Sequence, residues 1–557
     1  MEQFDFIIVG GGRAGCVAAS RLVQDYDARV LLLEAGQNDD SRLVKMPAGS
    51  FKMIFGGGDF VKFHETGAQT HLGGRTVSLP QGNVLGGGSS VNVMAYTRGS
   101  RYDYQRWNEA SGNTGWAFED LLPHFLKQEG NQRFHNEFHN GDGPLKVSEQ
   151  PYIVEGAHMF VRTMQRLGAP FTPDFNTGDL HGVGYHQATL YRGERCSAVR
   201  AFLDPIRSHP KLRIATKARA TRVLFKDNDA VGVEYRDGTG LQRASAAREV
   251  LLTAGALVTP MLLMLSGIGP AAHLAEQGIS VISDQPGVGQ SLQDHHSAFL
   301  IAKTKGAHGY HGQSNGMRMV WNGLQYMLFK SGPVASTGSE SMAFLNLDDP
   351  DEDPDFQFYA IQTMWPGIAN AKLDHGITFM ANLMKPKSKG SVRLRSRDPD
   401  APAVVDMNWL SHPDDERRFI KGLRFLRKVT GTDPLASIIA EELAPGPAVT
   451  EDGDVLDYIR RTTGSNYHPC GTARMGRPDD RGAVLTPDLR VKGVERLRVL
   501  DASMMPNIIS CNTNATVMAV ADRGIDLMMR EGLEANGPNL TTRSGSAREA
   551  GLERHPA

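Results

Sequence analysis

Apolar residues near the start of the chain fall into short runs separated by glycines and polar turns. Residues 4–9 form an apolar run that leads into three glycines, the residues after the glycines follow a helical pattern, and a second apolar run ends at Glu34. Short apolar runs bounded by glycine predict buried strands, and the pattern between them predicts a helix. We therefore expect a strand, a turn, a helix and a second strand in that order.

A longer apolar stretch, residues 250–269, raises the question of a membrane span. Polar and helix-breaking residues interrupt it, among them Thr253, Gly255 and Pro260. Because proline is tolerated in the first turn of a helix and is costly inside one, the pattern predicts a buried strand at 250–253 and a core helix that starts near Pro260. We expect no membrane span.

Three later regions have other patterns. Residues 390–410 alternate between apolar and polar positions and contain Pro/Asp turns, which predicts strands of an antiparallel sheet. The acidic residues 348–355 predict a solvated loop, and the polar residues 536–557 predict a disordered tail.

Composition and charge narrow the class of partner. The chain has 557 residues, of which 40% are hydrophobic and 22% are charged, and its net charge is −2. This balance is typical of a globular chain with a large core, and it offers no basic stripe for nucleic acid and no polybasic patch for an anionic membrane. We expect a small-molecule partner.

The cysteines and histidines predict neither a disulfide framework nor a metal site. The four cysteines lie far apart, and the N-terminus has no basic region before its apolar run, which together predict a reducing, cytoplasmic compartment. The histidine-containing segments 135–140 and 294–296 lack a convincing ligand set, so we expect them to be a solvated loop or packing residues.

The glycines after the first apolar run form a dinucleotide fingerprint. Glycines at these spacings tighten the turn, let the backbone approach a pyrophosphate and let the helix pack closely on the strand, while the helix N-terminus attracts the anion. The acid at the end of the second strand is expected to hold a ribose hydroxyl. The predicted cofactor contacts in this unit are Gly10, Gly12, Ala14, Gly15, Glu34 and Ala35.

Five further stretches resemble the glucose-methanol-choline (GMC) oxidoreductases, in the branch of the choline dehydrogenases. They are "GNVLGGGSSVNVMAYTRG" (82–99), "GALVTPMLLMLSGIG" (255–269), "PGVGQSLQDH" (286–295), "YHPCGTARMG" (467–476) and "DASMMPNIISCNTNATVMAVADRG" (501–524). The order of the stretches and their extent along the chain are similar to the family's. The resemblance implies bound FAD and the oxidation of an alcohol.

The resemblance also implies an α/β fold, α+β overall, with two domains. A Rossmann-type FAD-binding domain would be assembled from the discontinuous segments 1–150, 191–300 and 460–535. The segments 151–190 and 301–459 would form a substrate-binding domain, which in the family is an antiparallel sheet with covering helices.

Further cofactor contacts are implied by the same family motifs. The glycine and serine cluster allows close approach of the backbone to a flavin ring, and the family places an asparagine beside that ring. Members that tether the flavin through a histidine carry it where this chain has Val91, so we expect FAD to be held without a covalent bond. The contacts implied by position are Gly87, Ser90, Asn92, Ala220, Asp501, Ala502 and Thr516.

The resemblance assigns the catalytic pair to His468 and Asn514. An imidazole with a pKa near neutrality suits removal of the hydroxyl proton, because the developing alkoxide helps the neighbouring C–H bond to release hydride to flavin N5. The amide would orient the same oxygen. The product of a primary alcohol would be an aldehyde.

The substrate is less well defined. Val61, Lys62 and Phe63 stand in a region where many choline-processing members carry a tryptophan, whereas Glu340 matches a glutamate that choline enzymes share. A lysine disfavours a cationic substrate, so we favour a neutral primary alcohol. Choline dehydrogenase, a non-redox lyase of the same family and a flavoprotein with an inactive site remain open, and an NAD-linked enzyme would leave the later motifs unexplained.

The electron acceptor also stays open at this point. Oxygen, a quinone or a cytochrome could reoxidise the flavin. With a quinone, a cytoplasmic protein would be expected at the periphery of the inner membrane.

Overall fold

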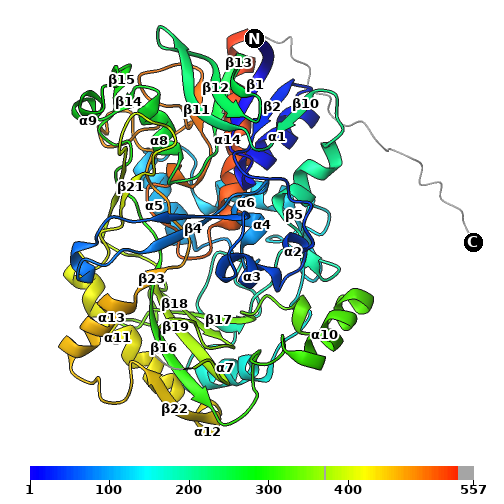
Figure 1. The fold of residues 1–557 in the computed structure, drawn as a ribbon, viewed down its shortest axis with the longest axis vertical. Helices are drawn as coiled ribbons and strands as arrows, with labels where there is room; N and C mark the ends of the chain where they lie inside the picture. The colour runs from blue at the N-terminus through cyan, green and yellow to red at the C-terminus, as the bar shows by residue number, and fades with distance from the viewer. Residues whose placement is uncertain (369–371, 537–557) are drawn as a thin grey trace, which may run out of the picture.

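A computed structural model describes residues 1–368 and 372–536, which fold around two seven-stranded sheets (Figure 1). The predicted tail, apart from its first residue, lies outside the described residues. Helical and strand elements alternate, which confirms the expected α/β class with an antiparallel second sheet.

The first sheet is built on the predicted N-terminal unit. β1 (Glu2–Val9) and β2 (Val30–Leu33) are parallel neighbours, and α1 (Arg13–Gln24) connects them, as the pattern predicted. β10 (Leu212–Ala215) extends the sheet beyond β2. The side chains of Ile7 and Ile8 are fully buried, as expected of a parallel sheet covered on both faces.

The other half of this sheet is mixed. β13 (Gly240–Leu252) pairs in parallel with β1 and with β24 (Leu497–Val499). Its N-terminal part pairs in antiparallel fashion with β12 (Asp229–Asp237), which in turn pairs with β11 (Arg219–Lys226).

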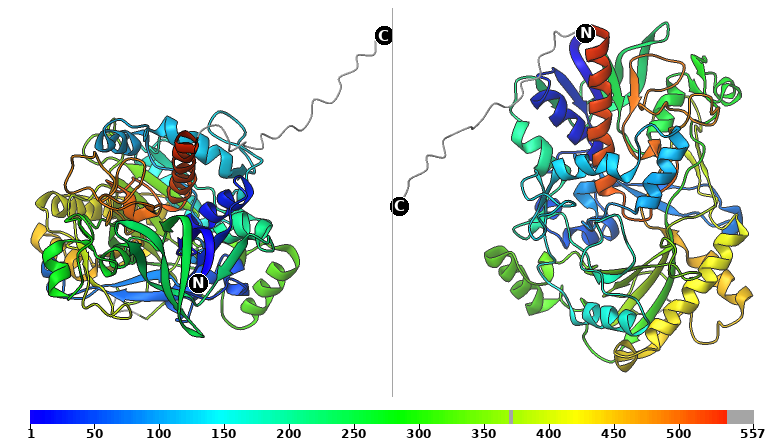
Figure 2. Two further views of the ribbon diagram at one scale, coloured as in Figure 1. Left: turned by 90° about the horizontal axis from the view of Figure 1, so that it is seen from above. Right: turned by 180° about the vertical axis from the view of Figure 1, so that it is seen from behind.

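Segments from both ends of the chain meet over the first sheet. The C-terminal helix α14 (Asn514–Asn536) packs against α1, and Figure 2 shows the two helices side by side. Residues 250–269 form the end of β13 and then α8 (Thr259–Leu265), as predicted. Within the described residues, no helix is both long and apolar enough to cross a bilayer.

The second sheet is antiparallel throughout. Its order is β22 (Ile439–Ala444), β16 (His296–Thr304), β19 (Gly376–Leu383), β18 (Phe356–Ile361), β17 (Ser341–Leu345) and β7 (Gly182–Tyr185), and β23 (Gly464–Ser465) also pairs with β16. The helices α7 (Glu155–Arg166), α11 (Pro413–Thr430) and α13 (Asp452–Thr462) pack on its strands or on one another. The domain boundary expected at residue 300 falls inside β16, which belongs to the second sheet.

Two expectations from sequence are confirmed in outline but differ in detail, because residues 390–410 do form antiparallel strands and residues 348–355 do form a loop. Within residues 390–410, β20 (Ser391–Arg393) and β21 (Val404–Asp406) pair only with each other, as a separate two-stranded sheet beside α8. The acidic loop 348–355 is not fully solvated, because Asp355 is buried and its carboxylate lies 2.8 Å from the guanidinium of Arg418 on α11. Tertiary contacts override the local polarity in both places.

Shorter elements connect the two sheets. Those that reach the site described below are α3 (Gly49–Phe55), β3 (Val61–Glu65), β4 (Ser78–Gly82) and α4 (Gly88–Val91). The others are α2 (Arg42–Lys45), α5 (Arg101–Ser111), α6 (Phe118–Gln128), β5 (Glu129–Asn131), β6 (Leu145–Val147), β8 (Leu190–Tyr191), β9 (Glu194–Arg195), β14 (Ile268–Gly269), α9 (Ala271–Glu276), β15 (Ser283–Asp284), α10 (Gly316–Phe329) and α12 (Leu435–Ile438).

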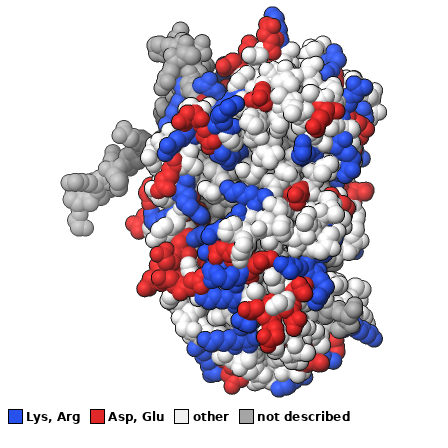
Figure 3. Space-filling view, turned by 90° about the vertical axis from the view of Figure 1, so that its left-hand side faces the viewer, with Lys and Arg blue, Asp and Glu red and all other residues white. Residues whose placement is uncertain are grey.

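Acidic and basic side chains are interspersed over the face seen in Figure 3, as expected from the small net charge.

Candidate active site

A cavity of about 810 Å³ extends from the first sheet to the second. Its walls come from the C-terminal ends of β1, β2 and β13, from α3, β3, β4 and α4, and from β18 and β19. The volume is near the upper end of the range for small-molecule sites, about 300–1,000 Å³. The C-terminal edge of parallel strands is where α/β sheets bind ligands.

The predicted glycines line one end of this cavity or support it. Gly12 is the N-cap of α1 and has no capping side chain, and a Cβ there would meet only the Thr253 carbonyl oxygen, at 3.8 Å. A Cβ on Gly15 would lie 2.1 Å from the Gly10 carbonyl oxygen. Gly12 thus leaves open backbone beside a helix N-terminus, which suits a pyrophosphate, and Gly15 serves the packing of α1.

Glu34 lies beside this helix terminus. Its two carboxylate oxygens accept the backbone N–H groups of Gly11 and Gly36, at 2.8 and 2.7 Å. Burial raises the pKa of its carboxyl to about 7, against these two hydrogen bonds. Ala14 and Ala35 also line the cavity, so the acid has room to accept ribose hydroxyls.

The expected contacts from the last third of the chain lie at the same end. Asp501 accepts the Gly255 backbone N–H at 2.8 Å and the Thr259 hydroxyl at 2.6 Å. These bonds fix the end of β24 against the start of α8. Ala220 on β11 and Ala502 also line the cavity.

The glycine and serine cluster places only some of its predicted residues on the cavity. Gly87 and Asn92 line it, whereas the Ser90 hydroxyl donates to the Leu85 carbonyl, at 2.7 Å, and stabilises the turn. Thr516 also lies off the cavity wall, with its hydroxyl 2.7 Å from the Tyr104 hydroxyl. These two side chains therefore support the wall from behind.

A buried arginine that sequence analysis did not identify holds Asn92. Arg195 donates to the Asn92 side-chain oxygen at 2.7 Å, to the Ser50 hydroxyl at 2.6 Å and to the Val44 carbonyl at 2.8 Å. All of these acceptors are neutral, and burial lowers the pKa of the guanidinium to about 9. Arg195 thus fixes the orientation of the Asn92 amide beside the cavity.

His468 lines the other end of the cavity, near the second sheet. Its backbone N–H donates to the Asp294 carboxylate at 2.8 Å. The following turn requires Gly471, whose φ is +86° and whose Cβ would lie 2.6 Å from the Ser291 carbonyl oxygen. Burial, then the neighbouring His295 and Arg13, hold the pKa of the His468 imidazole well below its usual value.

Two neighbours define the tautomer of His468. The Asn512 amide nitrogen, which can only donate, lies 3.4 Å from His468 Nε2, and His295 Nδ1 lies 3.0 Å from His468 Nδ1. From these contacts we assign the tautomer in which Nε2 accepts a hydrogen bond and the Nδ1–H donates to His295. This arrangement leaves a lone pair on Nε2 at the cavity wall, which is what a base requires.

The predicted partner Asn514 also lines the cavity, but its side chain forms a hydrogen bond with Arg13 and not with His468. The Asn514 side-chain oxygen accepts from the Arg13 guanidinium at 3.3 Å. Because that oxygen is engaged, the amide nitrogen is the group available to a ligand. Arg13 itself lines the cavity at the start of α1, where its charge also suits a pyrophosphate.

Sequence analysis missed three residues of this end. Residues 294–296 were expected to be a solvated loop or packing residues, yet Asp294 and His295 orient His468. Asn512 is the first asparagine of "NTNATVM", whose second asparagine was the predicted one. The available signal at 294–296 was a polar triplet shortly before the apolar residues of β16, but only the fold brings it to His468.

Aromatic side chains from α3 and from the segment after β18 also line the cavity. Phe55 and Trp365 line the cavity and contact each other edge to face, with ring centroids 4.9 Å apart. Glu340 does not line it, because its carboxyl is buried against the hydroxyls of Tyr310 and Ser336. Burial raises the pKa of that carboxyl.

Lys62 also lines the cavity, and burial, then the charge of Arg219, lowers the pKa of its ammonium group. On the β3–β4 pair Lys62 lies opposite Gln81, whose amide donates to the Ala254 carbonyl at 3.3 Å. The lysine therefore belongs with the nucleotide end of the cavity, where it was not expected.

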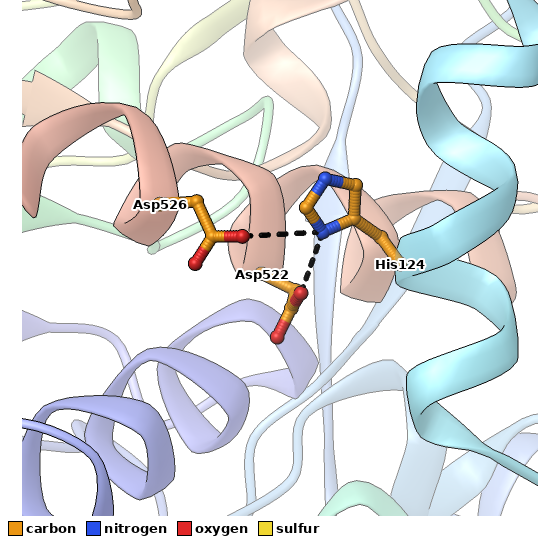
Figure 4. A group of neighbouring side chains, drawn as sticks. All are labelled: His124, Asp522 and Asp526. Atoms are coloured by element: carbon orange, nitrogen blue, oxygen red, sulfur yellow. Dashed lines mark hydrogen bonds and ion pairs between the residues drawn. The ribbon is translucent and has the colours of Figure 1, made fainter. Parts of the chain in front are cut away.

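The described residues contain one cluster with the spacing of metal ligands, and it lies outside the cavity wall. His124 on α6 faces Asp522 and Asp526 on α14, with His124 Nδ1 2.6 Å from an Asp522 oxygen (Figure 4). Arg21 on α1 donates to both carboxylates, at 2.6 Å to Asp526. Because Arg21 and the nearby Lys127 together supply two positive charges against the two acids, the cluster is an ion-pair network that ties three helices together.

Comparison with known proteins gives a consistent result over nearly the whole chain. Two family models described as GMC oxidoreductase match residues 4–297 and 386–521. The chain is 37% identical to an alcohol dehydrogenase (acceptor) of Pseudomonas putida over 539 residues, which is 95% of this chain and 96% of that protein. It is also 37% identical to an oxygen-dependent choline dehydrogenase of Brucella ovis, over 94% of this chain and 95% of that protein.

A solved structure has the same architecture. Pyridoxine 4-oxidase from Mesorbium loti superposes with a TM-score of 0.85 at 29% identity, covering 95% of this chain and 99% of that one.

Proposed function

Because the chain belongs to the GMC oxidoreductase family, we propose that it is an FAD-dependent oxidoreductase that converts a primary alcohol to an aldehyde. One observation carries the proposal. A single cavity joins the features that suit a dinucleotide, Gly12 and Glu34, to an unprotonated imidazole nitrogen on His468. We assign FAD binding to the segments around the first sheet and substrate binding to those around the second.

The cofactor contacts that we propose are the predicted ones that line the cavity, together with Arg13. The N-terminus of α1 and Arg13 would hold the pyrophosphate, Glu34 would accept the ribose hydroxyls, and Asn92 would lie beside the flavin ring. Bound FAD would supply the acceptor for a hydride. Ser90, Gly15 and Thr516 would act by shaping the wall.

We assign the role of general base to His468. Its Nε2 would accept the proton of the substrate hydroxyl, and its Nδ1–H stays directed at His295. The amides of Asn512 and Asn514 would donate to the same oxygen and orient the C–H bond. Because burial, then His295 and Arg13, lower the pKa of the imidazole, it is neutral at pH 7 and able to accept that proton.

The substrate that fits this wall is a neutral alcohol with an apolar body. Phe55 and Trp365 supply aromatic surface. Of the acids that line the cavity within the described residues, Glu34 and Asp501 are engaged by hydrogen bonds at the nucleotide end, and the third is Glu65. Choline remains the second candidate because a relative carries that name and because Trp365 offers a face for cation–π contact.

Anaerobic mixing with alcohols tests the function directly. The purified yellow protein should lose its flavin absorbance with at least one primary alcohol, and an equal amount of aldehyde should form. Oxidised absorbance that persists with every alcohol, together with cleavage of a cyanohydrin, would favour the non-redox lyase. Reoxidation by air, by a soluble quinone or by cytochrome c then identifies the acceptor.

A further inference from the structure

Helix α10 turns its apolar side toward solvent. It projects from the edge of the molecule near the second sheet, as Figures 1 and 2 show. Its side chains recur at the helical spacing of three and four residues, and each is about half exposed or more. The residues of this outer stripe are Met317, Val320, Trp321, Leu324, Met327 and Leu328.

The polar side of the same helix faces the protein. Asn322 is buried, and its amide donates to the backbone carbonyl of Gln313 at 2.9 Å. Tyr326 is also buried, under the ammonium group of Lys330 at 4.6 Å from the ring centroid. The orientation is therefore fixed by hydrogen bonds and packing, and it is the reverse of that found on a helix that covers a core.

Basic residues gather at the C-terminal end of α10. Lys330 lies 2.9 Å from Glu194, and the guanidinium groups of Arg192 and Arg200 lie over the ring of Tyr191. Lys45 also acts on the pKa of Glu194. Around the β8–β9 hairpin, these four basic side chains lie near a single acid, Glu194. Helix α10 itself contains Arg318 and no acidic residue.

We propose that α10 docks the protein onto the surface of an anionic lipid bilayer. A helix with a wide apolar stripe, a central tryptophan and a cationic border has the chemistry of an interfacial helix, which lies in the headgroup region without spanning the membrane. The positive border complements lipid headgroups of negative charge. The sequence did not predict it, because the fold gathers its basic residues from separate segments of the chain. The proposal is independent of the reaction assigned to the cavity.

A second copy of the chain fits this face less well. Stable interfaces between proteins use about 20–30 residues on each side, whereas α10 offers a single projecting helix with six residues in its stripe. Two such helices would also bring their cationic borders together.

The structure links the docking helix to the cavity wall. The segment after α10 continues through a 3₁₀ turn, Pro333–Ala335, where the Val334 carbonyl accepts the Ala48 backbone N–H at 3.2 Å. Ala48 precedes α3, and four residues after this turn Ser339 lines the cavity. A docked molecule would thus have the α3 side of its cavity close to the bilayer.

Vesicle flotation tests the proposal with the intact protein. Wild-type protein should float with phosphatidylglycerol vesicles and much less with phosphatidylcholine vesicles. The variant Trp321→Gln/Leu324→Gln/Leu328→Gln should lose this binding by more than about tenfold, since burial of one large apolar side chain alone is worth about that factor. Its flavin absorbance and its alcohol turnover in solution should not change.

A matched control uses exposed apolar residues elsewhere. Leu241→Gln/Val281→Gln alters side chains that are 56% and 44% exposed on the first-sheet side of the molecule and should bind vesicles as the wild type does. Equal loss in this control, no flotation of the wild type, or equal flotation with phosphatidylcholine would overturn the proposal. A wild-type dimer that the triple variant abolishes would assign the face to a second copy instead.

Discussion

The paired imidazoles of His295 and His468 make the base sensitive to its neighbour. The pKa of His468 is held below its usual value by burial and then by His295, so its imidazole is neutral and able to accept a proton at pH 7. The rate of flavin reduction should therefore rise with pH through an ionisation below 6.5 and be level above it. A level that begins only above pH 8 would contradict this electrostatic account.

The variant His295→Gln should move that rising limb to higher pH. Glutamine retains an oxygen that accepts the His468 Nδ1–H, and it removes the second ring that depresses the pKa of His468. Anaerobic reduction rates between pH 5 and 8 measure the shift, with Tyr467→Phe as a control at the adjoining wall. An unchanged midpoint would show that His295 only packs against His468.

Two glycines near the turn between β1 and α1 have different roles, Gly12 in cofactor binding and Gly15 in folding. Gly12→Ala places a methyl group in open space at an ordinary φ of −70°, so the apoprotein should fold normally. The methyl group would keep a phosphate away from the N–H groups at the start of α1, so FAD binding should weaken by about tenfold, the value of one hydrogen bond to a charged group. Gly15→Ala should instead lower the Tm of the apoprotein, because its methyl group would lie 2.1 Å from the Gly10 carbonyl. FAD titration and thermal unfolding of both variants check this contrast, and the reverse result would contradict it.

Helix α4 carries Val91 at the place where a covalent flavin link would need a histidine. Acid precipitation should therefore release the yellow chromophore into the supernatant. Flavin that stays in the washed pellet would show a link through some other residue.

These elements also show what could be predicted from sequence. The strand–turn–helix unit and α8 were predictable because glycine, proline and apolar spacing act locally. The burial of Asp355 and the separate β20–β21 pair were not, because partners distant in sequence decide them. The same holds for His295 and Arg195, whose polar contacts at the cavity are made across gaps of more than 100 residues. In the sequence, the apolar residues of α10 have the spacing of a helix that packs on a core. Only the fold shows that they face solvent and that the polar side packs on the protein.

The molecule as a whole should discriminate by charge and polarity of the alcohol. Phe55 and Trp365 give the cavity an aromatic surface, so kcat/KM should be higher for benzyl or medium-chain alcohols than for choline. The variant Phe55→Ala should reduce the difference in kcat/KM between these alcohols and choline, since it removes one ring of the edge-to-face pair. A higher kcat/KM for choline would mean that Trp365 acts as a cation–π partner.

The central claim is that one cavity brings bound FAD and the base His468 together. The reductive half-reaction of the His468→Ala variant tests it most directly. Stopped-flow mixing of the anaerobic protein with the best alcohol measures flavin reduction alone. The variant should keep its FAD and its fold while the rate falls by about 10²–10⁴-fold, the usual contribution of a positioned base, and Asn514→Ala should cost less. A His468→Ala protein that is reduced at close to the wild-type rate would contradict the account.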